Sequence, residues 1–179
     1  MEKPKFSIRK MNTSDLGPVA ALVKRSWLDT YVNKDFDITE DWIEDFWKRK
    51  DGESGNVERM EWRLRHDKMN DLVAIDRSGR IIGTSFQITL PDGGQEIVKL
   101  YVGKDYHGLG VGNSLMEDMI KWFDDDKPIE LGVTTFNQRA KKFYSRWGFE
   151  EIEGSEGIKF ERLPEIRMIR QPVSNKEEK

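Results

Sequence analysis

The sequence predicts a single domain of mixed α and β structure, in the order strand, three helices, three strands, helix, strand, helix and two strands. Apolar residues at helical spacing mark the helices, short apolar runs mark the strands, and turn sequences separate strands in the middle of the chain. A chain of 179 residues is large enough for one domain with a buried core. We place this domain at residues 1–172 and expect the charged segment 173–179 to be disordered.

The N-terminal third predicts one strand and three helices. Alternation of apolar and polar residues around Phe6 predicts a short first strand. The polar residues 12–14 supply N-cap candidates for a long helix that ends near Tyr31. Residues 39–50 and 54–67 are charged and contain tryptophan, and they predict two further helices.

The middle of the chain predicts a three-stranded meander. Residues 72–75 and 81–90 read as two strands, because a turn sequence at 77–80 separates them. A second hairpin signal, Pro-Asp-Gly-Gly at residues 91–94, leads into a third strand at 95–102.

The C-terminal part predicts two helices and three strands. Apolar residues between Val111 and Phe123 share one helical face after a glycine-rich loop, and residues 129–135 form a strand. Residues 137–147 predict a helix that stops at Gly148. Two final strands are expected at residues 149–154 and 158–170.

The composition excludes several classes of function. Lys and Arg number 30 against 33 Asp and Glu, a net charge of −3, so no basic excess indicates nucleic-acid binding. Cysteine is absent, which excludes disulfides, a thiol nucleophile and cysteine-ligated zinc, and we expect no metal cofactor. No apolar run approaches the roughly 20 residues that span a membrane. No signal peptide is visible at the N-terminus, so we expect a cytoplasmic protein without a membrane partner.

The most informative segment is the glycine-rich loop at residues 107–113. A strand precedes it and a helix follows it, so the first N–H groups of that helix can bind an anion. Gly108, Gly110 and Gly112 are spaced two and two, whereas the dinucleotide fingerprint needs two and then three. The P-loop needs a lysine after its last glycine, and Asn113 stands there instead. The loop matches neither of these two motifs, but its position before a helix still predicts a phosphate ligand.

The order of the elements and their motifs resemble the GCN5-related N-acetyltransferases (GNAT family), which transfer acetyl from acetyl-coenzyme A to amines. The resemblance runs from Phe6 to about Arg170. Its motifs are Leu100-Tyr101-Val102, then Tyr106-His107-Gly108-Leu109-Gly110-Val111-Gly112, and Asn137 with Ala140, Phe143-Tyr144 and Gly148-Phe149. It implies the GNAT fold, an α/β (α+β) domain with helices around a mixed, mostly antiparallel sheet of about six to seven strands. That sheet is splayed between its fourth and fifth strands.

The resemblance implies that acetyl-coenzyme A is the co-substrate. The implied contacts are Leu100, Tyr101, Val102, His107, Gly108, Leu109, Gly110, Val111, Gly112, Asn113, Asn137 and Tyr144. The pantetheine arm would pair with the backbone of Leu100 and Val102 in the gap of the sheet. The family usually has Gln or Arg where this chain has His107, which either adds a donor or is a solvated residue without a role. Asn137 contacts the coenzyme, caps its helix, or does both.

Three residues have implied catalytic roles. The amide of Val102 would stabilise the oxyanion that forms on the acetyl carbonyl. The hydroxyl of Tyr144 would protonate or solvate the leaving thiolate, and the alternative is a core tyrosine on the apolar face of its helix. Glu96 is a candidate base, although it follows a hairpin and could be an ordinary exposed residue.

Acceptor recognition is assigned to the end of the first long helix. Trp27 and Tyr31 are spaced i, i+4 and share a helix face, so with Asp29 they could form a pocket with apolar walls and an acidic rim. The alternative is that such aromatic residues only pack the helices onto the sheet.

These features predict an acetyl-coenzyme A-dependent N-acetyltransferase that acts on a primary amine of a small molecule or peptide. The amine would attack the thioester directly, and the protein would be a monomer or a homodimer. A non-catalytic acyl-coenzyme A sensor or regulatory module on the same fold is the alternative. A nucleotide-binding protein that does not use coenzyme A is a third possibility.

Overall fold

The computed structural model describes residues 6–49 and 52–172, and it follows the predicted order of elements with one addition. The helices are α1 (Leu16–Tyr31), α2 (Glu40–Arg49), α3 (Gly52–Arg63), α4 (Val111–Trp122) and α5 (Gln138–Arg146). The strands are β1 (Phe6–Lys10), β2 (Met69–Asp76), β3 (Ile81–Thr89), β4 (Gln95–Val102), β5 (Ile129–Thr134), β6 (Phe149–Glu151), β7 (Gly157–Lys159) and β8 (Leu163–Arg170). The predicted disordered tail at residues 173–179 lies outside the described residues.

The strands of the described chain form one eight-stranded sheet in the order β1-β2-β3-β4-β5-β8-β6, and β7 also pairs with β8. The prediction of a single strand over residues 158–170 is wrong, because this segment contains β7, a turn and β8. Phe160 and Glu161 make the turn with φ of 48° and 71°, a region that residues other than glycine rarely adopt. Neither residue is a glycine or a proline, so the sequence carries no local signal for this turn.

The sheet is splayed at the junction of β4 and β5, as predicted. These two strands are parallel and pair only from Gln95 to Ile97, opposite residues 129–131. On the other side of β4, Phe86 pairs with Lys99 and Gln87 pairs with Ile97, so one residue of β4 forms a bulge. Beyond this bulge β4 continues beside β3 alone, and the edge that faces β5 is unpaired.

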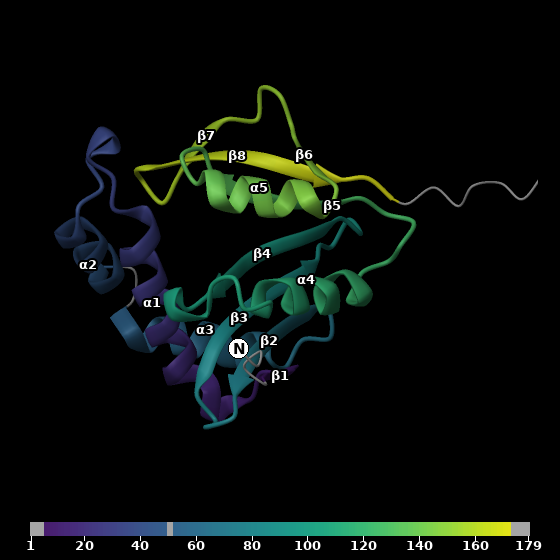
Figure 1. Cartoon of the computed structure of the whole chain (residues 1–179), viewed down its shortest axis with the longest axis horizontal. Coiled ribbons are helices and arrows are strands. Elements are labelled where there is room, and N and C mark those ends of the chain that lie inside the picture. The colour runs from purple at the N-terminus through teal and green to yellow at the C-terminus, as the bar shows by residue number, and fades with distance from the viewer. Residues whose placement is uncertain (1–5, 50–51, 173–179) are drawn as a thin grey trace, which may run out of the picture.

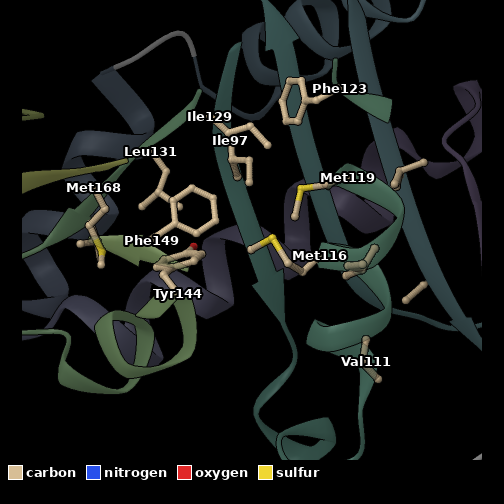
Figure 2. Close-up of a cluster of buried hydrophobic side chains, with 14 of the residues drawn as sticks. Ile97, Val111, Met116, Met119, Phe123, Ile129, Leu131, Tyr144, Phe149 and Met168 are labelled. Carbon is tan, nitrogen blue, oxygen red and sulfur yellow. The ribbon is translucent and has the colours of Figure 1, made fainter. Parts of the chain in front are cut away.

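Helices cover the two faces of the sheet with separate hydrophobic clusters. On one face, Met116 of α4 and Tyr144 of α5 pack with strand residues in a single cluster (Figures 1 and 2). On the other face, α1, α2 and α3 pack around Val19, Trp27 and Trp47. Within the described residues, no helix has both the length and the apolar composition required to cross a membrane.

Candidate active site

A cavity of about 720 Å³ opens where β4 and β5 diverge. One part of its lining comes from the glycine-rich loop at residues 107–113 and from residues 137–146, which we call the loop half. The opposite part, which we call the α1 half, is lined by residues of α1, β5 and the segment of β7 and β8: Ser26, Thr30, Tyr31, Gly132, Val133, Thr134, Lys159, Phe160, Leu163 and Glu165. The free edge of β4 lies between the two halves.

The glycine-rich loop presents a row of unpaired backbone N–H groups. Gly108 and Gly110 adopt φ of 76° and 91°, a region that favours glycine. The first helical hydrogen bond of α4 runs from the N–H of Ser114 to the carbonyl of Gly110, at 3.0 Å. The N–H groups of residues 110–113 have no partner in the part of the chain that the structure describes. Four free donors at the N-terminus of a 12-residue helix have the arrangement that favours an anion, as the predicted phosphate contact requires.

Three cationic side chains of α5 also line the loop half. Arg139, Lys142 and Arg146 are spaced i, i+3, i+7, so they share one helix face. None of the three has a carboxylate partner among the described residues, whereas the adjacent Lys141 pairs with Glu151 at 2.9 Å. These cations were not among the predicted site residues, although their helical spacing is visible in the sequence.

His107 connects the glycine-rich loop to β4 and α5. Its Nδ1 atom lies 2.6 Å from Nη1 of Arg139, and its Nε2 atom lies 2.9 Å from the carbonyl oxygen of Val102. A guanidinium only donates, so Nδ1 accepts this hydrogen bond and Nε2–H donates to Val102. The histidine is therefore a neutral link within the site, and it places Arg139 at the loop half.

The free edge of β4 offers backbone groups to the cavity. The N–H of Gly103 donates to the carbonyl of Ile82 on β3 at 2.8 Å. Since successive residues of a strand alternate between its two sides, the N–H groups of Val102 and Leu100 point away from β3 and toward the gap. This orientation is the one that the predicted oxyanion and pantetheine contacts require.

Tyr144 lines the cavity from α5, and only 8% of its surface is exposed. Its ring lies beside Phe149, with the ring centroids 6.0 Å apart (Figure 2). Its hydroxyl has no hydrogen-bond partner among the described residues. Burial raises the pKa of Tyr144, and nearby Tyr31 raises it further, so this hydroxyl stays protonated as a donor requires. The residue is thus both part of the core and in reach of a ligand in the cavity.

Glu96 is placed differently from the predicted base. Its carboxylate accepts a hydrogen bond from Arg167 at 2.7 Å, and the same guanidinium binds Glu130 at 3.0 Å. Neither carboxylate lines the cavity. A carboxylate held by a guanidinium has its lone pairs engaged, so this arrangement does not favour Glu96 as the base.

The predicted acceptor residues of α1 separate into three environments. Tyr31 lines the cavity, and its hydroxyl lies 3.3 Å from that of Tyr101. Trp27 is buried beneath the cavity lining, where its Nε1–H donates to the same Tyr101 hydroxyl at 2.9 Å. Asp29 is exposed and does not line the cavity, so the structure does not bring it together with Tyr31.

The α1 half also includes Lys159, Phe160 and Glu165, which were not predicted from the sequence as site residues. Glu165 reaches this half because it lies opposite Thr134 in the antiparallel pair of β5 and β8. Sequence pattern alone carries no signal for this register. No group of three or more His, Cys, Asp or Glu residues could hold a metal ion in the described part of the chain.

The model of the acetyltransferase (GNAT) family matches residues 36–149. This match spans more than half of the chain, and the protein therefore belongs to the GNAT family. An uncharacterized N-acetyltransferase of Mycobacterium tuberculosis is 34% identical over 86 residues, which cover 47% of this chain and 55% of that protein. A Mycobacterium bovis protein of the same description matches equally. The chain thus spans about half the length of the curated relatives it matches.

Solved structures confirm the GNAT fold. The PaiA N-acetyltransferase of Thermoplasma acidophilum, in complex with coenzyme A, has a TM-score of 0.75 at 20% identity and covers 93% of this chain and 99% of that one. A phosphinothricin acetyltransferase of Sinorhizobium meliloti with bound acetyl-coenzyme A has a TM-score of 0.70 at 16% identity, covering 97% and 92%. The ribosomal-protein-alanine N-acetyltransferase of Brucella melitensis has a TM-score of 0.68 at 20% identity, covering 92% and 99%.

Proposed function

We propose that this protein transfers the acetyl group of acetyl-coenzyme A to a primary amine of a small molecule or peptide. The observation that carries the proposal is that one cavity joins the free backbone edge of β4, an unpaired row of amides and the Tyr144 hydroxyl. Family membership supports it, as do the coenzyme A and acetyl-coenzyme A in two of the similar structures.

The loop half fits the phosphates of the coenzyme. The pyrophosphate would lie on the amides of residues 110–113, where helix N-terminal donors favour negative charge. The unpaired cations of α5 would neutralise the remaining phosphate charge. Asn137 caps α5 by accepting from the N–H of Ala140 at 3.1 Å, which leaves its amide N–H groups able to contact the coenzyme.

The chemistry follows from the groups at the β4 edge. The lone pair of a neutral amine attacks the acetyl carbon, a C–N bond forms, and the negative charge on the carbonyl oxygen is stabilised by the N–H of Val102. Collapse of this intermediate breaks the C–S bond. The Tyr144 hydroxyl then donates a hydrogen bond to the departing sulfur. A tyrosine already has a higher pKa than a thiol, and burial raises the pKa of Tyr144 further. The hydroxyl therefore stabilises the thiolate by a hydrogen bond and does not transfer its proton completely.

The amine loses its proton to water in the cavity in this proposal, because Arg167 holds Glu96. We therefore assign Glu96 no direct contact with the acceptor. Substitution of Glu96 by Gln would then change the rate little, whereas a direct base role would require a large loss.

A thiol-release assay with acetyl-coenzyme A and a panel of amines tests the proposal. We expect turnover by the wild type and a fall in kcat of about 10- to 100-fold in Tyr144→Phe. This is at or below the low end of the roughly 100- to 10,000-fold contribution of general acid catalysis, because a thiolate leaves readily. The KM for acetyl-coenzyme A should not change. Tyr106→Phe is the matched control, because its hydroxyl is bonded to Asp76 at 3.0 Å and its loss should leave kcat unchanged.

Tight binding of coenzyme A without turnover on any amine would overturn the enzyme proposal in favour of an acyl-coenzyme A sensor. Protection of the fold by ATP or NAD, but not by coenzyme A, would contradict both.

A further inference from the structure

The carboxylate of Glu165 on β8 occupies space that only a glycine at position 132 of β5 leaves open. It lies over Gly132, and a Cβ atom added to Gly132 would overlap the carboxylate group of Glu165. Gly132 has no positive φ, so its backbone conformation does not require glycine. Since glycine within a strand costs stability, its presence here is explained by the space that the Glu165 side chain needs.

Glu165 is also the one carboxylate that lines the cavity among the described residues. Two acidic side chains of neighbouring strands, Glu96 and Glu130, are engaged by Arg167 and lie outside the lining. The negative charge of Glu165 therefore contrasts with the cations of the loop half. It also acts on Tyr31, whose pKa is raised mainly by burial and in small part by the charge of Glu165.

The chain itself supplies a primary ammonium to this carboxylate. Nζ of Lys159 lies 3.1 Å from Oε1 of Glu165. The Lys159 side chain is 45% exposed and the Glu165 side chain is 22% exposed, so the pair is open on the lysine side. Such pairs contribute little to stability, and a competing cation can displace the lysine at small cost.

Aromatic side chains complete the surroundings of this ion pair. Phe160 follows Lys159 directly, and the left-handed turn packs its ring 5.2 Å from the ring of Trp27. Tyr31 lines the same half from α1. Aromatic faces bind alkyl chains by burial and attract ammonium groups through the ring quadrupole.

We infer that Glu165 selects the acceptor, by binding the ammonium group of a cationic primary alkylamine that displaces Lys159. The inference rests on the proposed function, and it defines the acceptor class as alkylamines that bind as ammonium ions and lose one proton to water before the nitrogen attacks. Glu165 is a specificity residue in this inference. Gly132 is a positioning residue, because it makes room for the carboxylate.

Two acceptors of different charge test the inference at saturating acetyl-coenzyme A. Butylamine is a cation at neutral pH and aniline is neutral. We expect Glu165→Gln to raise the KM for butylamine at least about tenfold, as a charge-assisted contact is lost, and to leave the KM for aniline within about twofold. Gly132→Ala should reproduce this pattern by displacing the carboxylate.

Lys159→Met should act in the opposite direction. It keeps an unbranched chain of similar length but removes the competing ammonium, so the KM for butylamine should fall several-fold. A purely structural role for the ion pair predicts the same direction of change for both partners. Equal changes in KM for the two amines, or a rise in KM in Lys159→Met, would overturn the inference.

A binding measurement separates this inference from the proposed function. If the wild type acetylates neither amine, the proposed function fails, and butylamine is titrated calorimetrically into the protein with coenzyme A present. Binding by the wild type that Glu165→Gln abolishes would support the inference. Equal binding by both proteins, or binding by neither, would refute it.

Discussion

The two halves of the cavity present different kinds of chemical group. The loop half consists of consecutive backbone amides at residues 110–113 and of exposed cations on one helix. The α1 half consists of the side chains of Tyr31, Phe160 and Glu165, which come from three separate elements. Backbone donors survive most substitutions, whereas a side-chain pocket changes with each residue. We therefore expect coenzyme binding to be robust and acceptor choice to depend on single residues.

The similar structures agree with this contrast. Their sequences are only 16–20% identical to this chain, and their names refer to acceptors as different as phosphinothricin and a ribosomal-protein alanine. A common fold with different acceptors is expected when the shared ligand is held by the backbone and the variable ligand by side chains.

The largest expected effect comes from Gly110→Ala. Because a Cβ at this position has open space around it, the cost arises from the backbone, and alanine at φ of 91° costs about 1–2 kcal/mol. The added methyl group also stands among the amides that we propose hold the pyrophosphate. We expect the Kd for coenzyme A to rise about 30-fold or more, measured by calorimetry.

Gly17→Ala is the matched control for this substitution. Gly17 lies in α1 with open space and no positive φ, so alanine should stabilise the protein by less than about 1 kcal/mol and leave coenzyme A affinity unchanged. Unchanged affinity in Gly110→Ala would contradict a backbone-made loop half.

The next effect concerns a buried cation on β4. Burial, and then the charge of Arg63, lower the pKa of Lys99 to about 8, and Asp71 lies 3.9 Å from its Nζ atom. An exposed lysine holds its proton to about pH 10.5. Between these pH values the unfolded chain binds more protons, so stability rises with pH from about 8 upward. Below pH 8 the buried charge destabilises the fold.

Lys99→Met should therefore stabilise the protein at pH 7 and remove the rise in stability above pH 8. The full shift corresponds to about 3 kcal/mol, and we expect about half of that because 15% of the side chain is exposed. Urea unfolding at pH 7 and at pH 10 measures both effects. Lys142→Met is the control: this exposed cation of the loop half should affect coenzyme binding and leave stability unchanged.

The smallest effect is expected for Arg139→Gln. This exposed guanidinium contacts His107 and lines the loop half, so its loss should raise the Kd for coenzyme A by about three- to tenfold at low salt. The difference should shrink at high ionic strength. Arg162→Gln removes the same charge from a residue that pairs with Asp37 outside the cavity, and it should leave this Kd unchanged. A similar loss in both variants would indicate a general charge effect.

Much of the fold could be predicted from the sequence because its signals are local. The strand at residues 95–102, the helix that ends at Tyr31 and the helix stop at Gly148 are confirmed. Each depends on neighbouring residues: alternation, helical spacing, or one glycine with positive φ. The turn at Phe160 was not predicted, because no turn-forming residue accompanies its left-handed conformation. The feature that accompanies it is a tertiary contact, the packing of the Phe160 ring against Trp27.

The site residues divide in the same way. The splayed sheet, predicted from the resemblance, is confirmed, and the loop that faces it was found from three glycines in sequence. The partner of Glu96 could not be predicted, because Arg167 lies 71 residues later in the chain. The assigned roles of Val102, Tyr144 and Asn137 stay predictions that the proposed experiments test.

The sequence by itself determined the glycine-rich loop and its free amides, because backbone donors need only a turn, a glycine with positive φ and the start of a helix, all within a few consecutive residues. The tertiary structure alone decided the α1 half. Glu165 reaches the cavity only through its register opposite Thr134, the absence of a side chain at Gly132 and the turn that brings Lys159 to it. Register across a sheet depends on how whole strands pack. For this reason no local sequence pattern predicted Glu165, the carboxylate that we propose selects the acceptor.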